Sequence, residues 1–350
     1  MARDFGEHCE FIAQMSLALA ALGLMVGALA SGSILELAGS RSTMLSALFV
    51  YGVLGAGGIV IVDPLLLLAS RFGLGFACAC MVTTCVWGIA ATFEGNRRAR
   101  ALGISAALAS FSSLASTLIG GYLAQRGGWR LAFIQYPIFA AAGLLLVFIA
   151  LRQARLARNP TVAAEPFFRP LLPIYLLASL LSAVMFMGST QFAFLLAADG
   201  MSNPARRSLV MAGVTVMSTL TSFSYGALQK RWGTTRVFAG ALLSMSTALF
   251  TAGLSSSIAL AALSAVLMGF YVGVVIPFVH HVVTERSHPS SRSRAIGMLT
   301  AFNFLGGFLN PILLAPLGRA LGLRGAFLAV AGIMGLLVIG AARMSFKSSR

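Results

Sequence analysis

The sequence predicts an all-α membrane protein built from two pseudo-symmetric bundles of transmembrane helices, and three observations predict this class. The 350-residue chain is 58% hydrophobic and only 10% charged, with a mean hydropathy of +0.91, whereas soluble domains carry about 25% charged residues. Its apolar residues form eleven stretches that are each long enough to cross a bilayer as a helix. Sites in the front half recur in the rear half at a constant spacing of 194 residues.

The apolar stretches favour helices over strands. A strand of a membrane barrel is about ten residues long and alternates in polarity. Here the stretches are continuous and rich in Gly, Ala and Leu, which is typical of packed membrane helices. They cover residues 11–35, 43–62, 65–93, 102–124, 131–151, 171–198, 208–228, 237–255, 258–284, 295–317 and 325–342.

The repeat predicts how the helices pair. Gly32 corresponds to Gly226, and Gly39 corresponds to Gly233. The same spacing places the partner of stretch 171–198 before residue 1. We therefore expect a plan of six plus six helices that lacks its first, through a truncation or a misplaced start, and we number the visible spans 2 to 12. Further matches are Gly75 with Gly269, Arg100 with Arg294, Gly128 with Gly322, and Phe133 with Phe327.

The longest non-apolar segment divides the two bundles. It runs from Arg152 to Pro170 and holds several arginines and prolines. We predict an N-terminal bundle over 1–151 with spans 2–6, a cytoplasmic linker over 152–170, and a C-terminal bundle over 171–350 with spans 7–12.

The positive charge indicates membrane orientation and does not favour nucleic-acid binding. The formal net charge is +16, but the 25 Lys and Arg lie in short loops between apolar stretches. Seventeen of them fall in the loops after even-numbered spans and in the C-terminal segment. Because Lys and Arg collect on the cytoplasmic side, we expect a cytoplasmic C-terminus and a multi-pass protein of the inner (plasma) membrane.

Two short charged segments separate consecutive spans. The first, Gly32 to Arg41, reads GSILELAGSR, and the second, Gly226 to Arg236, reads GALQKRWGTTR. With two bundles of six, these segments resemble the loop signature G-x-x-x-D-R-x-G-R-R of the major facilitator superfamily. The first copy keeps Gly32, Glu36, Gly39 and Arg41, and the second keeps Gly226, Arg231 and Gly233, with Lys230 at the acidic position.

Two further motifs strengthen the resemblance to that family, and the junction between spans 5 and 6, at Gly128-Trp129-Arg130 with Phe133 and Pro137, is similar to that of its drug-efflux members. Arg71 and Gly75 match the motif R-x-x-x-G in span 4. Gly120 and Gly121 match the end of the antiporter motif G-P-x-x-G-G, although its Gly-Pro is replaced by Ser116-Thr117.

The resemblance implies that the loops act as a gate. In the family such loops latch the cytoplasmic end and separate when the cavity opens inward. Here Glu36 is expected to pair with a basic group near Arg97 to Arg100. A solvated loop that only fixes topology is the alternative, because an exposed ion pair contributes only about 0–1 kcal/mol.

Arg71 is the charged residue that falls within a span, and charges there are expensive and usually functional. It either faces the cavity, where the resemblance implies a part in substrate binding or proton coupling, or snorkels to the interface. None of the nine Asp and Glu lies mid-span. If coupling requires a carboxylate within the membrane, we expect that carboxylate on the absent span 1. His280 and His281 are substitutes whose position favours an interfacial role.

Uncharged polar residues complete the candidate site. An amide in lipid needs partners, so it faces the bundle interior. Gln191 and Asn303 are the stronger cavity candidates because the resemblance places spans 7 and 11 along the pathway. The remaining candidates are Gln14, Tyr271 and Asn310.

No nucleotide-binding loop, catalytic triad or metal-ligand cluster is visible, and the four cysteines are best explained as packing residues. We therefore predict no enzyme activity, no metal and no cofactor. The prediction is a monomeric secondary transporter in the lipid bilayer that moves a small organic solute by alternating access, with proton-coupled efflux favoured. Apolar or cationic solutes are favoured, and anionic or neutral ones stay open. The alternatives are a metabolite uptake carrier and a non-transporting truncated remnant or scaffold.

Overall fold

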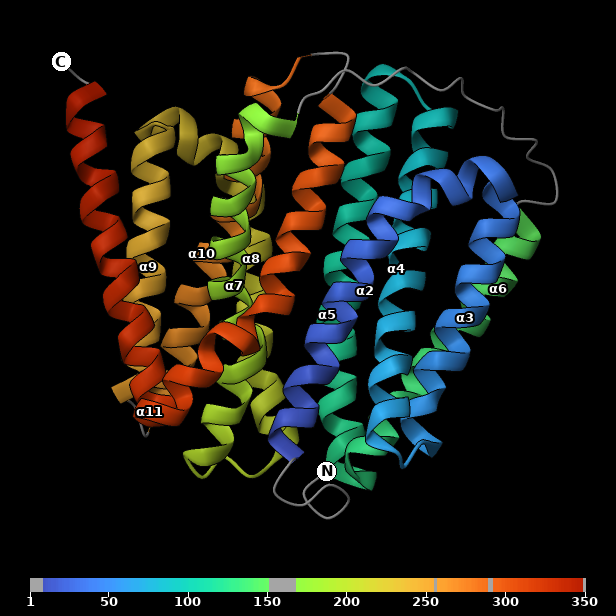
Figure 1. Ribbon diagram of the computed structural model, residues 1–350, viewed down its shortest axis with the longest axis horizontal. Helices are drawn as coiled ribbons and strands as arrows, with labels where there is room; N and C mark the ends of the chain where they lie inside the picture. The colour runs from blue at the N-terminus through green and yellow to red at the C-terminus, as the bar shows by residue number, and fades with distance from the viewer. Residues whose placement is uncertain (1–8, 151–167, 255–256, 289–291, 349–350) are drawn as a thin grey trace.

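The protein is a bundle of long helices, shown in Figure 1 as a computed structural model. The structure describes residues 9–150, 168–254, 257–288 and 292–348. Most of the predicted linker, 152–170, lies outside these residues. The described residues contain no strand, and their helices are α2 (Cys9–Ala38), α3 (Ser40–Val60), α4 (Pro64–Thr92), α5 (Gly95–Leu131), η2 (Ala132–Ile134), α6 (Gln135–Ala150), α7 (Phe168–Ala198), α8 (Pro204–Trp232), α9 (Thr234–Leu254), α10 (Ile258–Arg286) and α11 (Arg292–Ser348).

Within the described residues, nine continuous helical segments are long and apolar enough to cross a membrane. Two of them, Arg100–Ile149 and Ala295–Gly340, have 50 and 46 residues. At about 1.5 Å per residue, each is more than twice as long as the roughly 30 Å hydrocarbon core. Each contains two predicted spans, and the backbone leaves the helical conformation between them at Gly128 and at Gly322. The eleven predicted stretches therefore all correspond to helix.

Side chains next to the apolar stretches begin several helices. The Asp63 carboxylate accepts a hydrogen bond of 2.8 Å from the Leu66 N–H, and Pro64 occupies the first helical position of α4. Asn203 caps α8 in the same way, with Pro204 next to it. A capping side chain satisfies an N–H that has no partner in the first turn, and proline lacks that N–H.

The two halves have matching helix boundaries. Adding 194 to the ends of α3 gives 234 and 254, which are the ends of α9. The ends of α4 shift in the same way to 258 and 286, which are the ends of α10. Backbone conformation repeats as well, because φ is 78° at Gly39 and 79° at Gly233. The chain therefore consists of two pseudo-symmetric bundles, as the repeat predicts.

The predicted loops at Gly32–Arg41 and Gly226–Arg236 are wrong in extent. Helix α2 continues to Ala38 and α8 to Trp232, so one glycine at each site connects two helices. Helices of about 30 residues are roughly 45 Å long and extend beyond the hydrocarbon core, where charged residues remain helical in water. Only the glycine leaves the helix, because its positive φ is strained for residues that carry a Cβ.

Glycines bring the helices of each bundle close together. A Cβ on Gly75 of α4 would collide with the backbone of Ala20 and Leu24 in α2. A Cβ on Gly269 of α10 would collide with Val214 and Ser218 of α8 in the equivalent contact. In the rear bundle, α7 and α9 both pack against α11, while in the front bundle α3 packs against α4 and α6.

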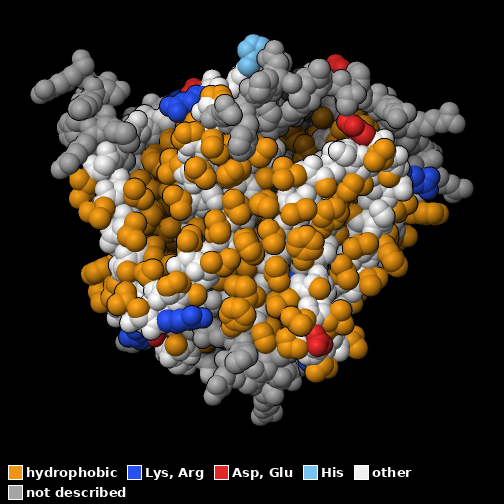
Figure 2. All heavy atoms as spheres, viewed as in Figure 1, with side chains coloured by type: hydrophobic (Ala, Val, Ile, Leu, Met, Phe, Trp, Pro, Cys, Tyr) orange, Lys and Arg blue, Asp and Glu red, His pale blue; other side chains and the backbone are white. Residues whose placement is uncertain are grey.

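The surface matches a membrane environment. Figure 2 shows hydrophobic side chains over the middle of the visible face, while blue and red charged side chains lie towards the upper and lower ends. Large apolar side chains on this surface, such as Leu146 and Phe223, are 67% and 70% exposed. Because lipid tails cover apolar surface without loss, this belt is consistent with a multi-pass membrane protein.

Candidate functional site

The two bundles meet along two pairs of helices, α2 with α11 and α5 with α8. We call the second of these contacts the α5–α8 seam. Its closest approach is at Gly121, where a Cβ would collide with the Ser208 side chain and lie 3.1 Å from the Pro204 carbonyl oxygen. Gly121 therefore lets α5 and α8 meet near the lower end in Figure 1, which is the predicted outer end.

A groove with a volume of about 450 Å³ begins beside this contact. We call it the seam groove. Along α8 it extends from Pro204 to Thr215, which is roughly 16 Å at 1.5 Å per residue. Its wall combines apolar, hydroxyl and cationic side chains, and its described lining contains no carboxylate. The lining residues are Ser113, Thr117, Ala193, Pro204, Arg207, Ser208, Met211, Val214 and Thr215.

Arg207 is the charged residue of the seam groove, although it precedes the predicted span 208–228. Span 208–228 was predicted four residues too short at its start, because α8 begins at Pro204. The Asn-Pro pair before Arg207 is a helix start signal that the apolar pattern alone does not use. Within the helix, Arg207 lies one turn from the end and is half-buried against the front bundle.

Arg71 lies inside the front bundle. Its side chain is 4% exposed, and Nη2 donates a hydrogen bond of 2.6 Å to the Leu54 carbonyl of α3. The guanidinium also bonds to the Ser70 hydroxyl and lies 4.9 Å from the ring centroid of Phe133. Arg71 therefore joins α4 to α3 and η2, and it neither lines the seam groove nor snorkels to the interface.

The polar residues predicted in spans 7 and 11 form contacts within the rear bundle. Asn310 is 1% exposed, and its Nδ2 donates a hydrogen bond of 2.6 Å to the Ala183 carbonyl of α7. Its Oδ1 accepts from Thr190 at 3.3 Å and from Gln191 at 3.5 Å. This network satisfies buried amides that would otherwise lie in an apolar interior.

Two of the other predicted candidates also have partners inside the rear bundle. Asn303 accepts a hydrogen bond of 3.0 Å from Ser182, and the Tyr271 hydroxyl donates one of 2.9 Å to the Leu181 carbonyl. Gln14 is half-buried in α2 and has a bonding partner. The structure thus places Arg71 in one bundle and Asn303, Tyr271 and Gln191 in the other, and it does not bring them into one site.

The gating segments lie at the upper end in Figure 1, which is the predicted cytoplasmic end. Glu36 and Arg41 are exposed, and no described side chain forms an ion pair with Glu36. A Cβ on Gly32 or on Gly226 would meet nothing within 4 Å, so neither glycine permits a close helix contact in this conformation. The predicted latch partner near Arg97–Arg100 includes side chains outside the described set, and the latch stays a prediction.

The rear segment has contacts of its own. Lys230 is exposed, and the Arg231 guanidinium lies 5.9 Å from the Trp232 ring centroid. Gly233 supplies the backbone turn with its positive φ.

Gly120, the neighbour of Gly121 in α5, also lies close to another side chain. A Cβ on Gly120 would lie 3.0 Å from the Gln135 side-chain nitrogen.

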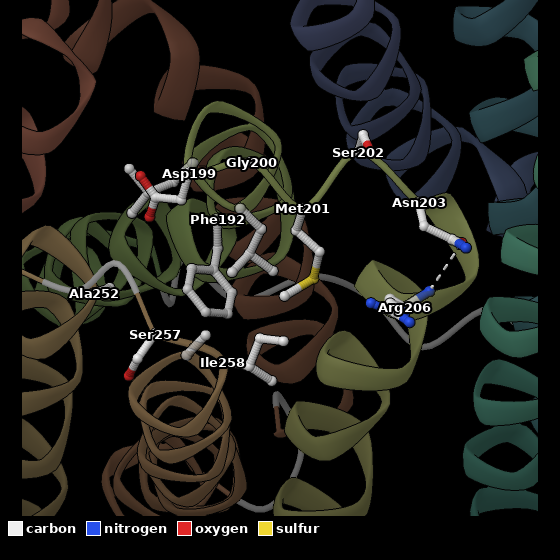
Figure 3. Close-up of a pocket in the computed structure, with 13 residues that line it drawn as sticks. Phe192, Asp199, Gly200, Met201, Ser202, Asn203, Arg206, Ala252, Ser257 and Ile258 are labelled. Carbon is white, nitrogen blue, oxygen red and sulfur yellow. Dashed lines mark hydrogen bonds between the residues drawn. The ribbon is translucent and has the colours of Figure 1, made fainter.

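A second cavity lies within the rear bundle beneath the α7–α8 connection (Figure 3). It has a volume of about 250 Å³ and is lined by residues such as Phe192, Met201 and Ile258. Nearby, Arg324 of α11 donates to the carboxylate of Asp199, with Nε at 3.2 Å from Oδ1. This cavity belongs to one bundle and does not connect the two, so it is the weaker candidate for a transport site.

Comparison with known proteins settles the family. The sequence model of the Major Facilitator Superfamily matches residues 1–218 and 180–349, and these two matches together cover almost the whole chain. The chain belongs to the Major Facilitator Superfamily. Members of this superfamily are membrane transporters and not enzymes.

Curated Major Facilitator Superfamily relatives match part of the chain. The uncharacterized MFS-type transporter YuxJ of Bacillus subtilis is 24% identical over 216 residues, which are 57% of this chain and 54% of that protein. The cephamycin export protein CmcT of Amycolatopsis lactamdurans is 32% identical over 139 residues, 39% of this chain and 27% of that protein. The chain therefore spans about half, or less, of the length of these relatives.

Solved structures show the same fold over nearly the full length. The nucleoside transporter NupG, in a mutant form, superposes with a TM-score of 0.75 at 14% identity and covers 95% of this chain and 91% of its own. A POT family transporter in complex with 5-aminolevulinic acid gives 0.79 at 12% identity, with 96% and 88% covered. At these identities the likeness establishes the Major Facilitator Superfamily fold.

Proposed function

We propose that this transporter exports a small organic solute by alternating access and that the solute binds in the seam groove. The position of the groove carries the proposal. It lies between the bundles, with α5 on one side and α7 and α8 on the other. In transporters built from repeats, the substrate binds where the repeats meet, and rocking one bundle against the other exposes it to each side in turn.

Export through the inner (plasma) membrane is the direction we propose. Relatives that match include an export protein and the multidrug resistance protein Stp of Mycobacterium tuberculosis, which is 32% identical over 133 residues. The distribution of Lys and Arg favours a cytoplasmic C-terminus. We propose a monomer, because the groove is formed by the two halves of a single chain.

We propose protons as the coupling ion, with His281 of α10 as the residue that takes part in coupling. Its Nε2 lies 3.0 Å from the amide nitrogen of Gln229 in α8 and 3.4 Å from a carboxylate oxygen of Glu285. A neutral ring accepts from Gln229 through the Nε2 lone pair, whereas a protonated ring donates to Glu285. Gln229 also donates to Thr234 at 3.0 Å, so protonation changes contacts at the α8–α9 junction.

The experiment is counterflow in proteoliposomes that contain the purified chain. We expect exchange of a labelled organic solute, and faster export when a pH gradient is applied. Absence of counterflow with every solute of a charge-varied panel would indicate a non-transporting protein. Accumulation inside cells that express the chain, compared with cells that do not, would indicate an uptake carrier.

The coupling residue is tested by His281→Gln, with His280→Gln as the matched control. His280 bonds to the Ile276 carbonyl of its own helix at 2.8 Å and has no partner on α8 among the described residues. We expect His281→Gln to retain counterflow but to lose the response to the pH gradient. An unchanged response in that variant would rule out His281 as the coupling group.

A further inference from the structure

Two consecutive arginines at the start of α8 point to different places. A helix turns by about 100° per residue, so adjacent side chains leave its axis in different directions. Arg206 is exposed and lines the cavity beneath the α7–α8 connection (Figure 3). Arg207 lines the seam groove. The two residues have the same side chain and lie at nearly the same level along α8. Of the two, only Arg207 lies between the bundles.

The charge of Arg207 is not neutralised by any described residue. No described side chain forms an ion pair or a hydrogen bond with its guanidinium, and the described lining of the groove contains no carboxylate. The acid that precedes it most closely in the sequence is Asp199, which already accepts from Arg324. Arg207 is half-buried, and a cation in a cleft of a membrane protein without a partner is costly and is often functional.

The other groups in the groove complement a charged head and an apolar body. The hydroxyl groups of Ser208 and Thr117 already donate hydrogen bonds to backbone carbonyls of their own helices. The acceptors are the Ala205 carbonyl at 2.9 Å and the Ser113 carbonyl at 2.8 Å. Met211, Val214 and Ala193 contribute apolar surface to the same groove. Arg207 is thus the strong hydrogen-bond donor of the groove, next to a surface that binds hydrocarbon.

We infer that the seam groove selects organic anions, with the carboxylate of the solute bound by Arg207 and its carbon skeleton against Met211 and Val214. The inference rests on the proposed transport function. A planar guanidinium binds a carboxylate through two parallel hydrogen bonds, which an amide or an amine does not reproduce. An organic cation has no counter-charge here and is repelled by Arg207. The volume of the groove is in the range that holds small organic ligands.

The test uses three probes of one shape and different charge. They are naphthalene-2-carboxylate, its uncharged amide, and 2-naphthylmethylammonium. Binding to the purified full chain is measured as the shift in thermal unfolding temperature, and transport as counterflow in proteoliposomes. We expect the carboxylate to raise the unfolding temperature and to be exchanged, with the amide at least about tenfold weaker and the amine without effect.

The variants are Arg207→Gln, Arg207→Lys and, as the matched control, Arg206→Gln. We expect Arg207→Gln to weaken carboxylate binding by about tenfold or more, Arg207→Lys to be intermediate, and Arg206→Gln to stay within about twofold of the wild type. Arg207→Gln is also expected to raise the unfolding temperature without ligand, because it removes an unpaired cation. If Arg207 only stabilised the fold, Arg207→Gln would instead lower the unfolding temperature without ligand.

The outcomes separate this inference from the transport proposal. Carboxylate binding that depends on Arg207 without counterflow would support the anion site and refute transport. Counterflow that is equal for the amide or the amine, or unchanged in Arg207→Gln, would refute the anion site and retain the transporter. No binding of the carboxylate to the wild type, or an equal loss in Arg206→Gln, would also refute it.

Discussion

At the scale of the residue, two arginines have surroundings that the sequence pattern did not predict. Arg71 falls within a predicted span and is therefore the expected functional charge, but the structure surrounds it with Leu54, Ser70 and Phe133 of its own bundle. Arg207 falls just before a predicted span and receives no role, but it lines the seam groove. The pattern of apolar stretches indicates how far into the membrane a side chain lies. Only the packing of the helices decides which neighbours that side chain contacts.

The role of Arg71 is tested by Arg71→Lys. Lysine carries the charge on a single nitrogen and lacks the planar guanidinium that bonds to Leu54 and Ser70 and lies over the Phe133 ring, so we expect a loss of roughly 1–3 kcal/mol of stability. The affinity for the transported solute should not change, because Arg71 does not line the seam groove. Thermal unfolding and counterflow measure the two quantities.

The control for that variant is Arg126→Lys. Arg126 is exposed, and its guanidinium lies 4.9 Å from the Tyr122 ring centroid near the end of α5. Its replacement should leave the unfolding temperature nearly unchanged. If Arg71→Lys instead weakened solute binding at unchanged stability, a direct part in substrate binding would follow, as the sequence resemblance implies.

At the scale of the element, the helix ends repeat as clearly as the packing contacts at helix centres. The spans differ in sequence, but Gly39 and Gly233 share a positive φ, as do Gly128 and Gly322, and each pair is 194 residues apart. Composition and length were sufficient to predict the helices. The extension of α2 and α8 beyond the membrane was not predictable from hydropathy, because charged residues form helix in water as well as loops.

Gly322→Ala tests the conformation at the turn within α11. Gly322 has a φ of 70°, so a Cβ there introduces strain, and we expect a loss of about 1–2 kcal/mol. Gly318→Ala is the matched control in the same helix. It has no positive φ, and a Cβ would meet nothing within 4 Å, so it should be neutral or slightly stabilising. Equal unfolding temperatures for the two variants would show that the backbone turn is not required.

At the scale of the whole molecule, the proposed alternating access requires movement at the seam between the bundles. Gly121 and Ser208 close it near the predicted outer end, and the seam groove lies directly beside that contact. Close contact through a glycine is compatible with separation, because it involves no interlocking side chain. If the bundles rock about the groove, this contact opens and closes once in each transport cycle.

A reversible cross-link tests that movement. In the double variant Gly121→Cys and Ser208→Cys, we expect a disulfide under oxidising conditions once α5 and α8 move slightly apart, because an added Cβ on Gly121 would otherwise lie only 2.4 Å from the Ser208 Cβ. Oxidation should then stop counterflow, and a reductant should restore it. Each single variant is the control for oxidation of the native cysteines. Full counterflow in the cross-linked protein would show that the seam does not part at this point.

The sequence by itself determined the membrane class, the helices, the repeat at 194 residues and the family, because each depends on composition, spacing or local backbone geometry. Only the tertiary structure decided which polar side chains share a site. It placed Asn310 and Tyr271 in bonds within one bundle, Arg71 in bonds within the other, and Arg207 in the groove between them. The reason is that side chains leave a helix in every direction around its axis. Which neighbour a side chain such as that of Arg207 meets depends on where its helix begins and on which helix packs against that face.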